Sequence, residues 1–165
     1  MSEDLFTAHL GDFAASELFK RTFREGMDLV EETAAYLDGP GREESRALSR
    51  SGALAYAGES MRLTTRLMQV ASWLLVQRAV KENEMSATDA RADKYRINEV
   101  HLSKSLSGTK ELPDALQDLI IRAGRIYERT RRLDEKLYGD AQENTGARAV
   151  SDQMSRLNAA FGGRV

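Results

Sequence analysis

Proline occurs at only two of the 165 positions, Pro40 and Pro113. Because proline interrupts helix interiors, two isolated prolines leave long stretches in which a helix can continue unbroken. No stretch shows the strict alternation of apolar and polar residues that is typical of a half-buried strand. Hydrophobic residues make up 41% of the chain and charged residues 30%, an ordinary balance for one globular domain. The sequence therefore predicts an all-α fold, a three-helix bundle with long antiparallel helices.

The first predicted helix covers residues 16–38. At about 100° per residue, its apolar side chains fall on one half of the helical wheel and its charged side chains on the other. Ser16 is a candidate N-cap, since its hydroxyl can accept a hydrogen bond from an amide of the first turn. The helix is expected to end at Asp38-Gly39-Pro40, because glycine can adopt the left-handed conformation and proline cannot continue a helix.

The second predicted helix begins near residues 43–46 and continues to about residue 81. From Met61 onward, apolar residues cover nearly its whole circumference, which indicates a central helix that is buried on several sides. The same pattern is compatible with a dimer interface. Small residues from Gly52 to Gly58, together with Gly26 on the first helix, predict a close crossing of these two helices.

The third predicted helix covers residues 113–139, since proline is suited to a first helical turn and glycine to a helix end. Residues 83–107, which precede it, have no clear period. After Gly139 the chain is polar and contains several glycines, a composition typical of mobile tails. The predicted organisation is a helical domain, residues 1–139, followed by a mobile C-terminal tail, residues 140–165.

Charge and composition exclude several classes of protein. The net charge of -2 and the isoelectric point near 5.8 argue against general binding to nucleic acids. The absence of cysteine excludes disulfides, thiolate metal sites and cysteine nucleophiles. Residues 1–10 lack the basic start and the apolar run of a signal peptide, and residues 67–80, the most apolar stretch, are too short and too polar to span a bilayer. We therefore expect a cytoplasmic protein without a membrane partner.

No catalytic constellation is visible. His9 and His101 are isolated, so no histidine-based metal site is predicted, and the sequence contains no phosphate-binding loop, dinucleotide fingerprint or nucleophile elbow. We expect no cofactor, no metal and no enzymatic activity. Arg62 and Arg66, one helical turn apart, leave one alternative, because small helical enzymes of the chorismate-mutase kind bind anions with arginines inside a bundle. Buried arginines are more often paired with acids for structural reasons, which weighs against this alternative.

A stripe of basic residues runs beside the apolar face of the third predicted helix. In one interpretation it contacts an acidic protein surface or a phosphate backbone, which makes a nucleic-acid-associated regulator the second candidate function. In the other it is a solvated face, in which Asp118 and Glu128 pair with the arginines four residues later. Those pairs weaken the local field and favour the solvated face. The arginine stripe comprises Arg122, Arg125, Arg129, Arg132 and Lys136.

The predicted tail contains four apolar residues at helical spacing. Positions i, i+4, i+7 and i+11 share one helix face, the arrangement by which a peptide helix docks into a groove. One interpretation is a partner-binding segment that folds on contact. The alternatives are packing of the tail on the bundle and an accidental pattern. The four residues are Val150, Met154, Leu157 and Phe161.

Several segments of the first two predicted helices resemble one known family. They are FREGM (23–27), VEETA (30–34), YLDGPGR (36–42) and the long run AYAGESMRLTTRLMQVASWLL (55–75). All four are similar to the RcdA-type regulators of CtrA degradation. The resemblance is close over residues 18–85 and looser over the third helix.

This resemblance implies a non-enzymatic adaptor with a three-helix-bundle fold that is usually dimeric. Members of the family help the ClpXP protease to destroy the cell-cycle regulator CtrA. They act on a protease that is primed by a response-regulator adaptor, and they link cargo to it. The resemblance further implies a mobile C-terminal tail that matters for activity, and a cytoplasmic protein that concentrates at a cell pole. Its partners are expected to be primed ClpXP, CtrA-like cargo and a second copy of the chain.

Overall fold

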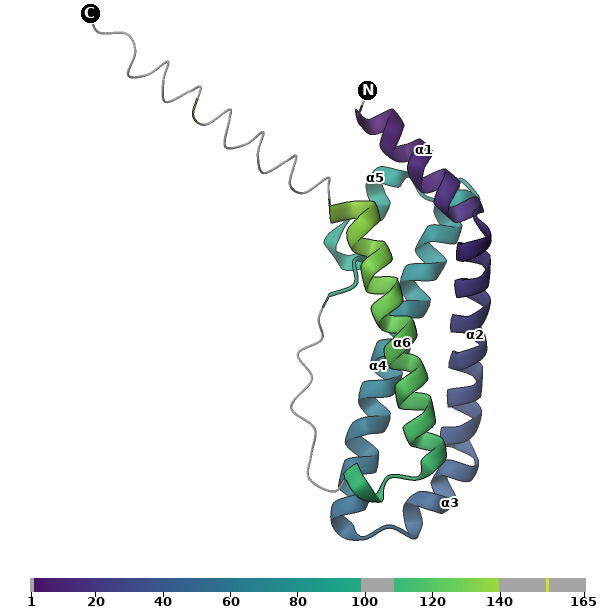
Figure 1. Cartoon of the computed structure of the whole chain (residues 1–165), viewed down its shortest axis with the longest axis vertical. Coiled ribbons are helices and arrows are strands. Elements are labelled where there is room, and N and C mark those ends of the chain that lie inside the picture. The colour runs from purple at the N-terminus through teal and green to yellow at the C-terminus, as the bar shows by residue number, and fades with distance from the viewer. Residues whose placement is uncertain (1, 99–108, 140–153, 155–165) are drawn as a thin grey trace, which may run out of the picture. The chain divides into compact units, whose positions relative to one another are not determined.

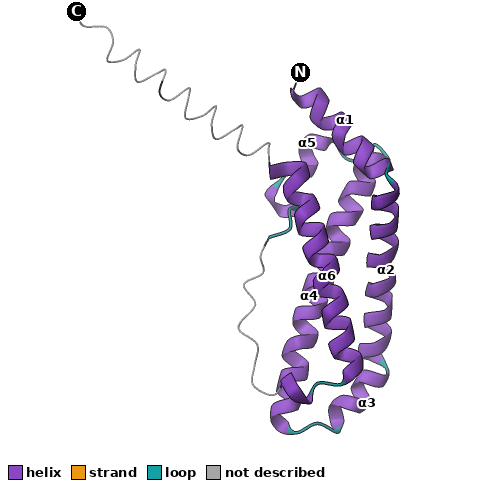
Figure 2. Cartoon of the chain, in the orientation of Figure 1, coloured by secondary structure: helices purple, strands orange, loops and turns teal. Residues whose placement is uncertain are grey.

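The structure is a computed structural model that describes residues 2–98, 109–139 and 154. Within these residues every regular element is helical and no strand occurs, as Figure 2 shows. The predicted all-α fold is therefore confirmed. The chain divides into two compact units, Met1–Arg131 and Arg132–Val165, and each is described by itself.

The first helix of the bundle begins where the sequence predicts. It is α2, Glu17–Asp38, and the hydroxyl oxygen of Ser16 accepts a hydrogen bond from the Phe19 amide at 3.2 Å. An additional helix, α1, Ser2–Ala15, precedes it and was not predicted. The ring of Phe13 on α1 meets the rings of Phe19 and Trp73 edge-on, with centroids 5.7 and 6.0 Å apart. Helix α1 thus extends the apolar core beyond the three predicted helices.

The chain reverses direction at Gly39 in a way that differs from the prediction. Gly39 has φ -119° and ψ -109°, so it ends α2 without the left-handed conformation. Pro40 does not end the helical region but begins a second short helix, α3, Pro40–Arg46. Proline is well placed there because the first turn of a helix needs no amide donor. The Tyr36 hydroxyl donates a 2.6 Å hydrogen bond to Glu44 and ties α3 to α2.

The central helix, α4, Arg50–Lys81, is the longest element among the described residues. It begins with its own cap, since the hydroxyl oxygen of Ser49 accepts from the Gly52 amide at 3.1 Å. Shorter elements follow, and then the last long helix. They are α5, Ala87–Ala90, 3-10 turns at Asp93–Tyr95 and Thr109–Glu111, α6, Asp114–Asp134, and a π-helical turn at Glu135–Gly139.

The directions of the three long helices are only partly as predicted. Helix α2 is antiparallel to both neighbours, but α4 and α6 run parallel (Figure 1). Leu63 and Ile120 line one small space, and further along both helices Leu74 and Ile126 approach Gly26. The physical reason is the long connection 82–113, which returns the chain to the end where α4 begins. There the Ser49 hydroxyl lies 2.5 Å from the Glu111 carboxylate.

Gly26 lies where α2 meets side chains of both α4 and α6. A β-carbon added at Gly26 would lie 2.8 Å from the Leu74 side chain and 3.3 Å from that of Ile126. The predicted crossing of Gly26 with the small residues 52–58 is therefore wrong, since large side chains of α4 and α6 fill the space. Gly52 instead lies against Glu111. The core around this point consists mainly of Leu29, Leu63, Leu67, Val70, Trp73, Leu74, Leu116, Leu119, Ala123 and Ile126.

Candidate protein-binding surfaces

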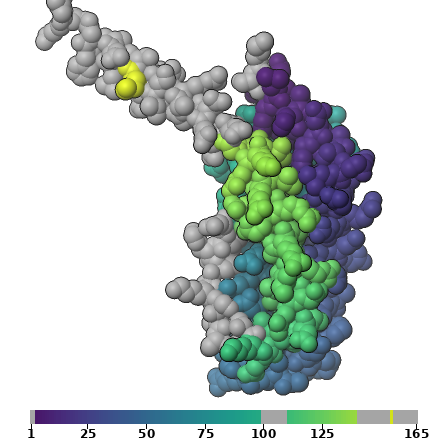
Figure 3. Space-filling model, viewed as in Figure 1, coloured from purple at the N-terminus to yellow at the C-terminus, as the bar shows by residue number. Residues whose placement is uncertain are grey.

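The first half of the arginine stripe is occupied by acidic residues of α2. Arg122 donates to both carboxylate oxygens of Glu32, at 2.7 and 2.6 Å, and to Asp118 at 3.1 Å. Arg129 donates to Glu25 at 2.5 Å. Side chains of α2 and α6 lie against each other on the side of the molecule that Figure 3 shows. Bidentate pairing of arginine with a carboxylate fixes geometry as well as charge, so these arginines join α6 to α2.

The rest of the arginine stripe remains exposed, and only one of its two predicted ion pairs is present. The predicted pair of Asp118 with Arg122 is confirmed, whereas Glu128, expected beside Arg132, bonds to Arg131 at 3.2 Å. Arg125 is exposed and has no ion pair among the described residues. Arg132 and Lys136 are also exposed. Arg122 and Arg129 therefore form a neutralised contact between helices, which neither interpretation predicted, and the solvated-face interpretation is right only for the pair of Asp118 with Arg122.

The ion pair of Glu32 with Arg122 should make the stability of the fold depend on pH. The hydrogen bond from Arg122 holds the pKa of Glu32 below its usual value of 4.5. The pair therefore stabilises the fold above that usual pKa, and the contribution disappears as the pH falls through the lower pKa of the folded state. Both side chains are about half exposed, so screening limits the contribution to less than about 1 kcal/mol.

We expect Glu32→Gln to lower the free energy of unfolding near neutral pH and to have no effect in acid. Urea denaturation of the wild type and the variant, between about pH 7 and about pH 3, measures this difference. Glu31→Gln is the matched control, because Glu31 is exposed and has no ion pair in the described part of the chain. A difference that persists undiminished in acid would contradict an ionic role for Glu32.

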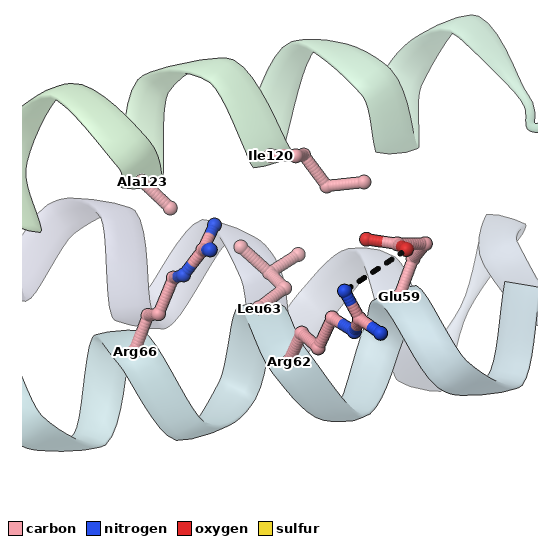
Figure 4. Close-up of a pocket in the computed structure, with 6 residues that line it drawn as sticks. All are labelled: Glu59, Arg62, Leu63, Arg66, Ile120 and Ala123. Atoms are coloured by element: carbon pink, nitrogen blue, oxygen red, sulfur yellow. Dashed lines mark ion pairs between the residues drawn. The ribbon is translucent and has the colours of Figure 1, made fainter. Parts of the chain in front are cut away.

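Arg62 and Arg66 do not form the anion-binding pocket of the enzymatic alternative. The space that these two residues line together with Glu59, Leu63, Ile120 and Ala123 is too small for a water molecule, and Figure 4 shows the six lining side chains. The Arg62 guanidinium lies 3.9 Å from the Glu59 carboxylate. The Arg66 guanidinium lies 5.9 Å from the centre of the Tyr127 ring, a cation–π contact. Both arginines are thus engaged within the bundle, and the helical-enzyme hypothesis loses its site.

An open groove lies between α2 and the C-terminal part of α4. It has a volume of about 450 Å³. Its apolar side is formed by α2, and the Arg78 guanidinium of α4 lies 5.3 Å from the centre of the Phe23 ring. Sequence analysis did not identify this groove, which forms only where the two helices meet. The α2–α4 groove is lined by Phe19, Lys20, Phe23, Arg24, Met27, Asp28, Arg78, Lys81 and Glu82.

A second surface follows the outer side of α4. Four large apolar side chains are exposed there, each seven residues after the previous one. A spacing of seven is close to two helical turns, so the four side chains form one line along the helix. The sequence analysis noted a possible dimer interface on this helix without naming its residues, although the spacing alone singles them out. The α4 stripe consists of Leu54, Met61, Met68 and Leu75, which are 60, 71, 58 and 46% exposed.

The chain is similar to known proteins in both sequence and structure. Residues 10–161 match a family model described as "Protein of unknown function (DUF1465)". A crystal structure of RcdA from Caulobacter crescentus CB15 is 59% identical in sequence, covering 78% of this chain and 97% of that chain, with a TM-score of 0.65. No match was found among curated proteins. The chain belongs to the RcdA family. The resemblance in the first two long helices is thereby confirmed.

The family match in this RcdA-type chain reaches residue 161 and so includes the four apolar tail positions. Among them, Met154 is helical and 62% exposed. Val150, Leu157 and Phe161 lie outside the described residues, as does most of the predicted mobile tail. Their role in docking stays a prediction.

Two absences hold for the described part of this RcdA-type chain. No helix there combines the length and the apolar character needed to cross a membrane. No group of three or more histidine and carboxylate side chains there is arranged to hold a metal ion.

Proposed function

We propose that the chain is a non-enzymatic adaptor that helps to deliver a CtrA-like transcription regulator and other cargo to the ClpXP protease. Membership of the RcdA family carries this proposal. The structure supports it through its surfaces, which include an open groove and an apolar stripe. Such features suit binding of proteins. Two arginines of the stripe, Arg122 and Arg129, are already paired with acids of α2, which weakens the support for a nucleic-acid-associated regulator.

The α4 stripe supports a homodimer as the working form of the adaptor. Four large apolar side chains exposed in one line are characteristic of helices that pair with another helix. Small residues lie beside them, and the hydroxyls of Thr64 and Thr65 donate 2.8 Å hydrogen bonds to the carbonyls of Ser60 and Met61 in the same helix. The hydroxyl protons of both threonines are therefore already used within the helix. Two copies of the stripe can pair about a two-fold axis.

The tail, residues 140–165, is proposed to contact primed ClpXP or its response-regulator adaptor, while the helical domain, residues 1–139, holds cargo and the second copy. The four apolar residues of the tail would dock on that partner as one helix face. The exposed Arg125 and Arg132 offer a further contact for an acidic partner. The adaptor would act in the cytoplasm together with the protease, concentrated at a cell pole, which imaging of a fluorescent fusion checks.

Degradation of a CtrA-type substrate by purified ClpXP and its priming adaptors tests the proposal. We expect the full-length chain to accelerate loss of the substrate, and the chain truncated after Gly139 to lose most of that acceleration, roughly tenfold or more. A full-length variant with serine at positions 150, 154, 157 and 161 should lose it too. Serine at the neighbouring polar positions Gln153 and Asn158 is the matched control. No acceleration by the full-length chain, with all components active, would contradict the adaptor role.

A further inference from the structure

The α2–α4 groove combines an apolar floor with a basic rim. Phe19 is almost fully buried at its base, and Phe23 and Met27, one and two turns further along α2, are partly exposed. Partly exposed aromatic and sulfur-containing side chains gain from being covered by another apolar group. A partner that covers this floor must therefore bring apolar side chains of its own.

The rim has an excess of positive charge. Four of its side chains are basic, Lys20, Arg24, Arg78 and Lys81, and two are acidic, Asp28 and Glu82. This excess is local, because the chain as a whole has a net charge of -2. A partner with the complementary charge must therefore be acidic.

Two of these cations are without an acidic partner in the described part of the chain. Lys20 pairs with Glu17 at 3.2 Å, and Arg78 lies 3.7 Å from Glu82. Arg24 and Lys81, on opposite walls of the groove, have no ion pair among the described residues, and both are exposed. Carboxylates of a partner bound above the floor would therefore be able to pair with Arg24 on one wall and with Lys81 on the other.

We propose that the α2–α4 groove binds an acidic, amphipathic peptide segment of a partner protein. Apolar side chains of that segment cover Phe23 and Met27, and its carboxylates pair with Arg24 and Lys81. A phosphate backbone would satisfy the cations but leave the floor exposed to water. A volume of about 450 Å³ lies within the range of small binding pockets and suits a few side chains. This inference adds a binding site to the proposed function and does not depend on delivery to a protease.

The test selects peptides from a random library on the full-length protein and then measures their affinity by fluorescence anisotropy. We expect the selected peptides to be enriched in Asp and Glu around leucine or aromatic residues. Arg24→Glu combined with Lys81→Glu should weaken the best peptide by about tenfold or more, and added salt should weaken its binding to the wild type. Alanine in place of the apolar residues of the peptide should also abolish binding.

The control variant carries the same change of charge elsewhere. Arg50→Glu combined with Lys110→Glu alters two exposed basic residues outside the groove and should bind the peptide as the wild type does. A peptide with lysine in place of its acidic residues should bind the groove variant better than the wild type. The proposal is overturned if selection yields no acidic enrichment, if the control variant loses as much affinity as the groove variant, or if the charge-swapped peptide gains nothing. Thermal melts confirm that both variants are folded.

Discussion

We expect Leu10→Ala to lower the free energy of unfolding by about 2–5 kcal/mol. Leu10 lies on α1 and its side chain is fully buried, with 0% of it exposed. Removing a fully buried leucine side chain costs the burial of its methyl and methylene groups and leaves a cavity that the surrounding residues fill only in part. The effect should be as large as for a leucine of the three long helices, because α1 packs against α2 and α4.

Trp73 makes this measurement direct. It is the only tryptophan in the chain, it is 1% exposed, and its ring contacts that of Phe13 on α1. Its fluorescence during urea denaturation therefore reports the loss of the core beneath α1. Leu5→Ala is the matched control on the same helix, since Leu5 is 71% exposed and should change little. Equal midpoints for the two variants would show that α1 is not part of the folded core.

The second large effect is expected on association. Met61→Glu combined with Met68→Glu should raise the dissociation constant of the proposed homodimer by about a hundredfold or more. Each copy would place two carboxylates against an apolar helix face, and an unpaired charge that is taken out of water is costly. Both residues are largely exposed in the single chain, so the fold of the monomer should be unaffected.

Sedimentation velocity over a dilution series measures the change in association. The control variant combines Leu5→Glu with Ile121→Glu, which adds two carboxylates at exposed apolar positions outside α4. It should associate as the wild type does. A wild type that is monomeric at every concentration would refute the dimer, and equal loss in both variants would place the interface elsewhere.

Most boundaries of the long helices could be predicted because their signals are local, but the predicted start of the second helix at residues 43–46 was wrong, since a separate helix, α3, ends at Arg46 and α4 begins at Arg50. Ser16 caps α2, and Pro113 immediately precedes α6, as expected from the sequence. Helix α1 was missed although Phe6, Leu10 and Phe13 have helical spacing. Gly11 weakens its helix propensity, and the first predicted helix was started at the Ser16 cap. The contact that makes α1 stable, with Trp73, is distant in sequence and leaves no local pattern.

The relative direction of α4 and α6 could not be predicted for a related reason. Helical periodicity shows which face of a helix is apolar, but not which way the helix runs. Only the length of the connection 82–113 hinted that the chain can return to its starting end. The partners of the arginine stripe were hidden in the same way. Glu25 and Glu32 were assigned to the charged half of α2. A helical wheel does not show that this half meets the arginine stripe of α6.

The surfaces were accessible to sequence reasoning to different degrees. The α4 stripe could have been separated from the core, because Leu54, Met61, Met68 and Leu75 repeat every seven residues on one side of a helix that is apolar all round. The α2–α4 groove could not, since it needs the packed positions of two helices. The anion pocket was wrongly considered because Arg62 and Arg66 share a face, while the neighbours that fill that face come from α6.

The parallel arrangement of α4 and α6 also sets the order in which the bundle can form. Helices α2 and α4 are joined through the short α3, so their pairing closes a short loop and costs little chain entropy. Bringing Glu111 to Ser49, which are 62 residues apart, closes a much longer loop before any contact of α6 repays that cost. In kinetic terms, we expect α2 and α4 to form the hairpin onto which α6 docks last.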